Sequence, residues 1–203
     1  MNAAARGQSW FAPQAQHPAG SRRAVFFDRD GVLNETTVRE GTPHPPARPE
    51  ELRIARGAPD ALRALRGAGF LLVVVTNQPD VARGTQRRDI VEAINARLRA
   101  ALPLDAIYVC YHDDRDACSC RKPQPGLLLR AAAEHAIDLP KSFMIGDRWR
   151  DIEAGRRAGC LTIRLEQPYA RADPESAADY QTRSLPDAAS WILARCAPAG
   201  GVP

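Results

Sequence analysis

The stretch Ala24-Val25-Phe26-Phe27-Asp28-Arg29-Asp30-Gly31-Val32 decides the fold. Four apolar residues that stop at an acid are typical of a buried strand that reaches a polar edge. The pattern returns in the strand predicted over 70–75, which ends at Thr76, and in the strand predicted over 142–145, which leads to Asp147. Ligands of parallel sheets bind outside the carboxyl ends of the strands. We therefore expect these three polar ends to meet in one crevice.

Strands and helices alternate along the rest of the chain. Apolar runs predict further strands over 106–110 and 160–165, and helical spacing predicts helices over 57–68, 86–101, 126–136, 149–158 and 187–195. This alternation predicts an α/β fold, a Rossmann-like three-layer arrangement whose mostly parallel sheet is covered on both faces. Segment 35–56, with prolines at 43, 45, 46 and 49, predicts an extended loop or a short arm.

The chain as a whole has the composition of one globular domain. Of its 203 residues, 44% are hydrophobic and 26% are charged, which is ordinary for a protein with a single core. We predict a disordered tail over 1–23, one domain over 24–196 and a flexible C-terminus over 197–203. No apolar run is long enough to span a bilayer, and the N-terminus lacks the apolar core of a secretory signal. We expect a cytoplasmic protein that does not bind membranes.

The basic residues of the chain favour a small anionic partner. The net charge is +4 and the pI is near 9.0. The charges are scattered, without a run of five and without interleaved aromatic residues, which argues against nucleic acid. Only two of the 28 basic residues are lysines, Lys122 and Lys141. A lysine kept in such a chain suggests a position where a compact point charge matters.

Asp28 and Asp30 are candidates for phosphoryl-transfer chemistry. Being two residues apart, they can face the same space while Arg29 points away. One carboxylate can act as a nucleophile and the other as general acid and base. An isolated Asp-x-Asp is more often part of a turn or cap, but Asp147 adds a third acid, and three carboxylates would repel without a cation such as Mg²⁺. Asp151 either caps the following helix or supports this site.

Donor groups are predicted at the same edge of the sheet. Thr76 and Asn77 end the most apolar strand and offer hydroxyl, amide and backbone N–H groups to a phosphoryl group, although both residues are also common in turns. Lys122 precedes a predicted helix, whose N-terminus favours anions. Its charge would neutralise the nucleophile and the phosphoryl group, and the alternative is a solvated surface lysine.

Over about residues 24–165, these segments resemble in order the signature motifs of the haloacid dehalogenase (HAD) superfamily of phosphohydrolases. The matching segments are Asp28-Arg29-Asp30-Gly31, Val75-Thr76-Asn77, Lys122, and Gly146-Asp147 with Asp151. Many members carry a cap domain after the first or second motif. The proline-rich arm is too short for one, and the segment before Lys122 is largely used by a helix, a strand and a loop. We therefore expect a capless HAD-like enzyme with an open site.

The resemblance implies a role for each motif residue. Asp28 would be the nucleophile and Asp30 the general acid and base, with Thr76 and Lys122 stabilising the phosphoryl group. Mg²⁺ would be held by Asp28, the backbone carbonyl of Asp30, and Asp147. The implied reaction is hydrolysis of a phosphomonoester through an aspartyl-phosphate.

A cluster of cysteines precedes Lys122. Cys110-Tyr111-His112 and Cys118-Ser119-Cys120 supply three thiolates and one imidazole, the ligands of a closed, structural Zn²⁺ site. The alternatives are buried free cysteines or a reactive thiol pair. A zinc ion here would fix the loop that aims Arg121 and Lys122 at the substrate. We expect three acids of this loop to be solvated rather than to bind metal: Asp113, Asp114 and Asp116.

The loop also indicates a branch of the superfamily. Its cysteine pattern leading into Arg121-Lys122-Pro123, with Thr76-Asn77-Gln78 and Ala82-Arg83-Gly84 upstream, is similar to the D-glycero-D-manno-heptose 1,7-bisphosphate 7-phosphatases and the related histidinol-phosphatases. The resemblance implies substrate contacts from four residues, Asn77, Gln78, Arg83 and Arg121. The chain departs from the branch at Pro79-Asp80, where Ser-Gly is usual, and at Arg148, where Lys is frequent.

The predicted function is hydrolysis of a small phosphorylated metabolite by a monomeric enzyme, with a heptose 1,7-bisphosphate as the first choice of substrate. Histidinol phosphate is the nearest rival, but its amines would favour acids in the pocket, whereas a bisphosphate favours arginines such as Arg83 and Arg121. Other sugar phosphates and nucleotides remain open. A catalytically silent binding module is disfavoured because every motif residue is present. Nucleic-acid end processing is disfavoured because no basic track accompanies the site.

Overall fold

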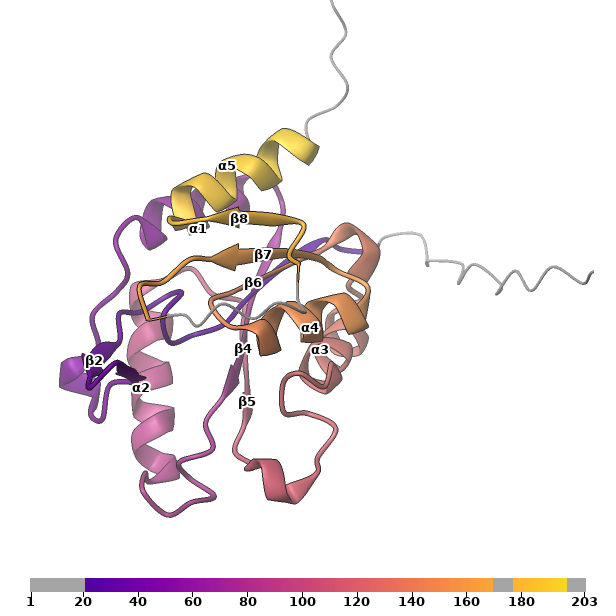
Figure 1. The fold of residues 1–203 in the computed structure, drawn as a ribbon. Coiled ribbons are helices and arrows are strands. Elements are labelled where there is room, and N and C mark those ends of the chain that lie inside the picture. The colour runs from indigo at the N-terminus through magenta and orange to yellow at the C-terminus, as the bar shows by residue number, and fades with distance from the viewer. Residues whose placement is uncertain (1–20, 170–176, 197–203) are drawn as a thin grey trace, which may run out of the picture.

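The protein is described by a computed structural model over residues 21–169 and 177–196. Its centre is a six-stranded sheet with the order β5-β4-β1-β6-β7-β8 (Figure 1). Every neighbouring pair of these strands is parallel, which confirms the predicted sheet. The strands are β1 (Ala24–Phe27), β4 (Leu71–Asn77), β5 (Ala106–Cys110), β6 (Phe143–Gly146), β7 (Leu161–Leu165) and β8 (Tyr180–Thr182).

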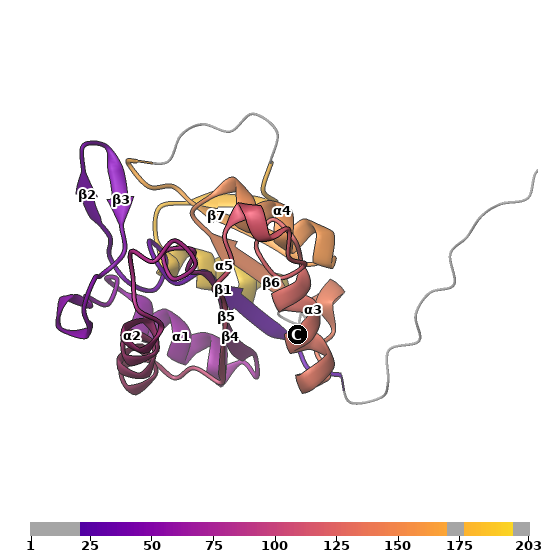
Figure 2. The ribbon, with the colours of Figure 1, turned by 90° about the horizontal axis from the view of Figure 1, so that it is seen from below.

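Helices cover both faces of this sheet and make the three predicted layers (Figures 1 and 2). On one face, Leu62, Ile94 and Ile192 belong to a core that joins the sheet to three helices, α1 (Ala58–Gly67), α2 (Arg88–Ala101) and α5 (Leu185–Cys196). On the other face, Leu128 and Ala154 belong to a core shared with α3 (Gly126–His135) and α4 (Trp149–Ala158). The central strands are apolar throughout because both of their faces are covered.

The proline-rich arm contains a small hairpin. Strands β2 (Thr37–Arg39) and β3 (Thr42–His44) pair only with each other, antiparallel, beside the main sheet. Glu40 and Gly41 both have positive φ, of 50° and 73°, as a tight two-residue hairpin turn requires. Three short 3₁₀ turns complete the described elements: η1 (Pro49–Glu51), η2 (Asp114–Asp116) and η3 (Leu139–Lys141). Within residues 21–169 and 177–196 no cap-sized insertion interrupts the fold, as expected.

Two local features were not predicted. Strand β8 is short and polar, and it forms because β7 offers an open edge on which Tyr180 pairs with Ile163 and stacks on Trp191, with ring centroids 4.9 Å apart. The second feature lies close to the first described residue, where the Arg22 N–H donates to the Ala136 carbonyl oxygen (2.9 Å). The predictions for 1–20 and 197–203 lie outside the described residues. None of the described helices has the length and apolar character that crossing a bilayer requires.

Candidate active site

The carboxyl ends of three strands converge as the sequence predicted. Strand β1 lies between β4 and β6, so Asp28 has Thr76 on one side and Asp147 on the other. The Asp28 N–H donates to the Ile145 carbonyl oxygen (2.9 Å), which extends the ladder to the acid and fixes its backbone. Asp28, Asp147 and Asp151 each offer a carboxylate oxygen within 4.8 Å of the others. The sheet and the first turn of α4 therefore place three acids around one point.

A buried lysine lies among these acids. Lys122 is 1% exposed, and its Nζ donates to Asp28 Oδ1 (2.7 Å) and to the Val75 carbonyl oxygen (2.8 Å). Nζ is also 2.5 Å from Asp151 Oδ1. Burial opposes the charged form, but the carboxylates of Asp151 and Asp28 outweigh it and raise the pKa of Lys122 above its usual range. The lysine is therefore a fixed positive charge beside Asp28.

One lysine does not balance three carboxylates. Burial, reinforced by the charges of Asp151 and Asp28, raises the pKa of Asp147 to about 8. Burial also raises the pKa of Asp28 to about 6, against the opposing effect of Lys122. Asp147 Oδ1 is buried and has no hydrogen-bond partner among the described residues. An acid set with an unsatisfied oxygen suits a hard divalent cation, so the residues present fit Mg²⁺.

Asp151 caps a helix and also contacts the buried lysine. Its Oδ2 accepts a hydrogen bond from the Arg148 N–H (3.1 Å) and so caps α4, while Oδ1 pairs with Lys122. This position depends on Gly146, where an added Cβ would lie 2.1 Å from the Asp151 Cβ. The glycine therefore lets the first turn of α4 approach the end of β6.

Asp30 has a different environment from Asp28. Its Oδ2 accepts hydrogen bonds from Arg29 Nη2 (2.8 Å) and Gln78 Nε2 (2.8 Å), and its Oδ1 accepts one from Asn34 Nδ2 (3.0 Å). Burial alone would raise the pKa of Asp30, but the Arg29 charge and these hydrogen bonds lower it. The expectation that Arg29 points away from the acids is wrong, because its guanidinium is fully buried and is hydrogen-bonded there to Asp30 and Asn95.

The residues after β4 contact the motif side chains. The Thr76 hydroxyl accepts a hydrogen bond from Gln78 Nε2 (2.9 Å), so Gln78 lies between Thr76 and Asp30. Asn77 makes reciprocal bonds with the backbone of Lys122: its Nδ2 donates to the carbonyl oxygen and its Oδ1 accepts from the N–H, both at 3.1 Å. Asn77 therefore ties the end of β4 to the segment that carries the lysine.

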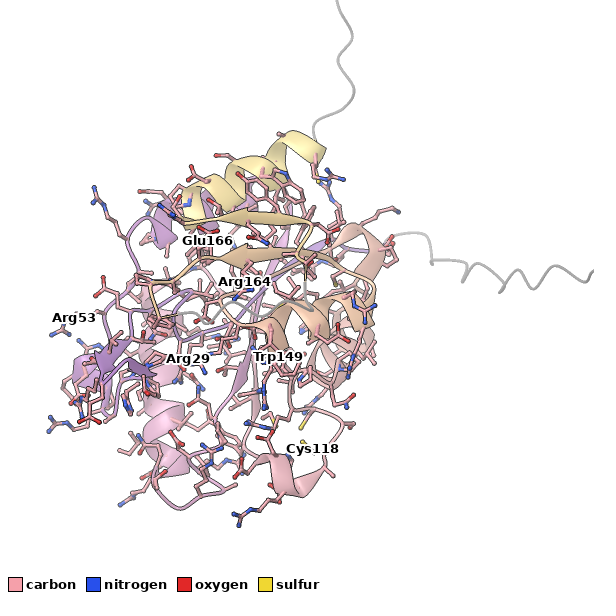
Figure 3. The ribbon with its side chains drawn as sticks, in the orientation of Figure 1. Arg29, Arg53, Cys118, Trp149, Arg164 and Glu166 are labelled. Atoms are coloured by element: carbon pink, nitrogen blue, oxygen red, sulfur yellow. The ribbon has the colours of Figure 1, made fainter. Side chains whose placement is uncertain are left out.

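The four predicted zinc ligands lie together at the loop between β5 and α3 (Figure 3). Cys110 Sγ is 3.7 Å from Cys118 Sγ and 3.3 Å from Cys120 Sγ, and Cys118 Sγ is 3.4 Å from Cys120 Sγ. The fourth ligand, His112, has Nδ1 3.3 Å from Cys120 Sγ. Zn–S bonds of about 2.3 Å separate tetrahedral ligands by about 3.8 Å. The donor set and its spacing therefore fit Zn²⁺.

Two acids of this zinc loop (residues 111–121) bind arginines. Asp113 accepts hydrogen bonds from Arg83 Nη2 (2.8 Å) and Nε (3.0 Å). Asp114 Oδ1 accepts from Arg121 Nε and from Arg150 Nη1, both at 2.8 Å. Hydrogen bonds from Arg121 and Arg150 hold the pKa of Asp114 well below its usual range. Neither acid belongs to the four-ligand cluster, and each is in addition paired with arginines, which the sequence did not predict.

A pocket of about 440 Å³ opens over the acids. The hairpin supplies Thr42 and His44 to its lining. The lining includes Arg148, as the sequence predicted, and also Arg150, which sequence reasoning missed although it follows Asp147 closely at the start of α4. The rest of the lining combines motif and loop residues: Asp28, Asp30, Pro43, Pro45, Asn77, Gln78, Pro79, Asp80, Arg83, Asp114, Arg121, Lys122 and Asp151.

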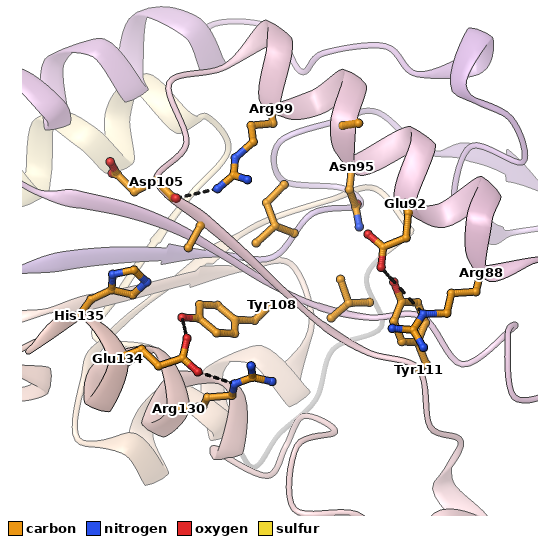
Figure 4. A pocket seen from close by; sticks show the side chains of 14 residues that line it. Arg88, Glu92, Asn95, Arg99, Asp105, Tyr108, Tyr111, Arg130, Glu134 and His135 are labelled. Atoms are coloured by element: carbon orange, nitrogen blue, oxygen red, sulfur yellow. Dashed lines mark hydrogen bonds and ion pairs between the residues drawn. The ribbon is translucent and has the colours of Figure 1, made fainter.

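A second cavity, of about 650 Å³, lies beside the edge strand β5 (Figure 4). It is larger than the first, but several of its charged side chains are paired with one another. Tyr108 and Arg130 both donate to the Glu134 carboxylate, at 2.6 Å and 2.8 Å, and the Tyr111 hydroxyl donates to Glu92. None of the strand-end acids lines it. The chemistry of the chain is therefore concentrated in the smaller pocket.

Known proteins of similar sequence are phosphatases. A family model described as HAD-hydrolase-like matches residues 119–188. The D-glycero-beta-D-manno-heptose-1,7-bisphosphate 7-phosphatase of Yersinia pestis is 37% identical over 187 residues, covering 85% of this chain and 96% of the relative. The enzyme of the same name from Escherichia coli K12 is 36% identical over 196 residues, covering 89% of this chain and 99% of the relative.

Solved structures lead to the same group. The D,D-heptose 1,7-bisphosphate phosphatase of B. bronchiseptica, solved with magnesium and phosphate, superposes with a TM-score of 0.73 at 28% identity, covering 85% of this chain and 99% of that one. A HAD-like phosphatase from Mesorhizobium loti, described as putative, has a TM-score of 0.68 at 27% identity, covering 93% and 91%. The chain belongs to the family of HAD phosphatases that contains the heptose-bisphosphate phosphatases.

Proposed function

We propose that this chain hydrolyses the 7-phosphate of D-glycero-D-manno-heptose 1,7-bisphosphate with Asp28 as the nucleophile. The observation that carries the proposal is the acid cluster of Asp28, Asp147 and Asp151 around the buried amine of Lys122. Two of these acids, Asp28 and Asp151, line a pocket together with Lys122 and four arginines. A phosphomonoester entering the pocket would meet a nucleophile, a fixed cation and a site for a second cation.

In the first step, a carboxylate oxygen of Asp28 attacks phosphorus and the bond from phosphorus to the sugar oxygen breaks. Lys122 occupies Oδ1 of Asp28, so Oδ2 is the attacking atom. The lysine lowers the repulsion between the carboxylate and the anionic phosphoryl group. The product is an aspartyl-phosphate on Asp28 and the sugar alcohol.

Asp30 moves the protons. It gives a proton to the departing sugar oxygen, and it later takes one from the water that attacks the aspartyl-phosphate and releases inorganic phosphate. The lowered pKa of Asp30 keeps it ionised in the free protein, as the second step requires. A phosphomonoester with a second pKa of about 6 carries a proton in part of its population at neutral pH. That proton can pass through Asp30 to the sugar oxygen as its bond to phosphorus breaks, because the departing oxygen is far more basic than either group.

Two metal ions complete the proposal. Mg²⁺ would be held by Asp28 and Asp147, together with the backbone carbonyl of Asp30 that the family resemblance implies, and when bound it offsets charge on the phosphoryl oxygens. Asp151 would support this site by pairing with Lys122 and by capping α4. Zn²⁺ would be held by the cysteine and histidine cluster of the zinc loop and would have a structural role.

The charge of the pocket favours a bisphosphate over histidinol phosphate. Besides Asp28, Asp30 and Asp151, the lining of the pocket holds four arginines but only two further acids, Asp80 and Asp114. Asp114 is itself bound by two of those arginines. A second phosphate would find bidentate donors there, whereas an amine would meet like charge. The arginines are Arg83, Arg121, Arg148 and Arg150.

The proposed limits of the catalytic unit are residues 24 and 196. Strand β1 and helix α5 lie at these limits, and both contribute to the cores of the sheet. We propose that this unit acts as a monomer, because the acids, the lysine and the arginines of the pocket all come from one chain.

A phosphate-release assay with Mg²⁺ tests the substrate. The panel is heptose 1,7-bisphosphate, heptose 7-phosphate, fructose 1,6-bisphosphate, histidinol phosphate and a nucleoside monophosphate. We expect the highest kcat/KM for the heptose bisphosphate, and a higher KM for heptose 7-phosphate because it lacks the second phosphate. A higher kcat/KM for histidinol phosphate would contradict the proposal. Each substrate is also run with the Asp28→Asn variant, which separates enzymatic release from background.

A further inference from the structure

The loop that follows β7 returns to the active site. Gln167 Nε2 donates to the Gly31 carbonyl oxygen (2.7 Å), and the Tyr169 hydroxyl donates to Asp147 Oδ2 (3.2 Å). These two anchors follow different strands, since Gly31 comes after β1 and Asp147 after β6. The loop therefore spans the ends of the two strands between which the acid cluster is built. The sequence motifs did not single out either Gln167 or Tyr169.

The two oxygens of the Asp147 carboxylate differ in their surroundings. Oδ2 accepts the Tyr169 hydroxyl, whereas Oδ1 is buried without a hydrogen-bond partner among the described residues. The residue is only 1% exposed, so bulk water does not satisfy Oδ1. A buried unpaired carboxylate oxygen is costly. The hydroxyl, with Arg148 Nε at a longer 3.9 Å, thus holds Oδ2, and Oδ1 is left unpaired, where a cation would satisfy it.

The contact between Tyr169 and Asp147 is packed against the backbone. A Cβ added at Gly31 would lie 2.4 Å from the Tyr169 hydroxyl and 2.7 Å from Asp147 Oδ2. Gly31 also has φ of +88°, a conformation that favours glycine. With the glycine on one side and the hydroxyl on the other, the carboxylate has little room to rotate. The glycine after Asp30 is therefore part of the same arrangement as Tyr169.

We propose that Tyr169 is a positioning residue for the catalytic magnesium ion, which it serves by fixing the orientation of Asp147. This inference rests on the proposed function, which supplies the ion. Groups that hydrogen-bond to a metal ligand fix its orientation, and their loss typically weakens metal binding by about 10–100-fold. Gln167 supports the same contact by anchoring the loop to Gly31.

Isothermal titration of the full chain with MgCl₂ tests the role of Tyr169. We expect Tyr169→Phe to weaken Mg²⁺ binding about tenfold, the lower end of the range for such groups, because the donor is neutral. The Mg²⁺ concentration for half-maximal activity should rise in parallel, while the KM for the sugar phosphate stays the same. Tyr108→Phe is the matched control, because its hydroxyl also donates to a carboxylate, that of Glu134 (2.6 Å), but at the second cavity.

The outcomes separate the inference from the proposed function. Mg²⁺ binding by Tyr169→Phe within twofold of wild type would overturn the inference alone. Wild-type protein that binds no Mg²⁺ would overturn the proposed function as well. If Tyr169→Phe melts at a markedly lower temperature than wild type, Gln167→Ala replaces it, with the same expected direction and a smaller loss. Unchanged affinity in a folded Gln167→Ala would then count against the inference.

Discussion

The acid cluster and the zinc loop are adjacent, but they are held in place by different means. Asp28 and Asp147 directly follow central strands, so the backbone ladder and two apolar cores fix them. The zinc loop has only the short 3₁₀ turn η2. Its shape depends on four side chains gathered at one point and on the pairing of Asp113 and Asp114 with arginines.

This difference separates chemistry from recognition. The sheet positions the groups that would act on phosphorus, and the loop positions arginines that would meet the rest of the substrate. Lys122 belongs to both regions, because it directly follows the loop and its amine lies among the acids. Perturbing the acid cluster should therefore remove catalysis without unfolding the protein. Perturbing the loop should affect stability and substrate affinity as well.

The largest expected effect comes from Asp28→Asn. The amide cannot serve as the nucleophile, so kcat should fall by about a thousandfold or more. The fold should be retained, since the amide is of similar size and Asp151 still pairs with Lys122. Phosphate release and thermal melting are the measurements. Asp60→Asn, at an exposed acid of α1, is the control and should leave both unchanged. Substantial activity in Asp28→Asn would contradict the assignment of catalysis to the acid cluster.

Loss of zinc should have the next largest effect. Cys118→Ser removes one of four ligands, and we expect it to release zinc and to lower the melting temperature by roughly 5–10 °C. The loop leads into Lys122, so kcat/KM should fall as well, by about tenfold. Zinc content by mass spectrometry, calorimetry and kinetics report the three effects. Cys196→Ser, at the end of α5, is the matched control. Purified wild-type protein without zinc would show that the loop is held by other means.

The smallest expected effect comes from an acid of the zinc loop that holds two arginines of the pocket. Asp114→Asn removes the charge that aligns Arg121 and Arg150. We expect KM for the bisphosphate to rise about three- to tenfold with kcat within twofold, because the acid cluster is not touched. Asp116→Asn is the control on the same loop, since that carboxylate accepts a hydrogen bond from the Asp113 N–H (2.7 Å) instead. A change confined to kcat would show that the loop acts on chemistry.

The sheet was accessible to sequence reasoning because its signal is local. Runs such as Ala24–Phe27 and Leu71–Val75 are apolar throughout, and the parallel arrangement follows from their alternation with helices. Strand β8 was not accessible, since Tyr180–Thr182 forms a strand only where β7 leaves an edge to pair with. The β2–β3 hairpin was predicted only as an arm, because Pro43 within β3 and the prolines that follow at 45, 46 and 49 hide its pairing.

The candidate site divides in the same way. The motif acids and Lys122 follow strands or precede a helix, so their convergence was predictable, although their roles still need experiment. The partners of charged side chains were not predictable. Arg29 turned out to be buried against Asp30 and Asn95, and Asp114 to join two arginines. Such pairings depend on distances between segments that no local pattern encodes.

The β2–β3 hairpin has a consequence for engineering. It pairs only with itself, yet Thr42 and His44 line the active-site pocket. The residues of both strands are half-buried or exposed, so neither strand contributes a buried side chain to the cores. A replacement hairpin of another length or sequence should therefore change the stability of the protein little. The hairpin is a natural place to graft diversity when the aim is to retarget the enzyme to a different phosphorylated metabolite.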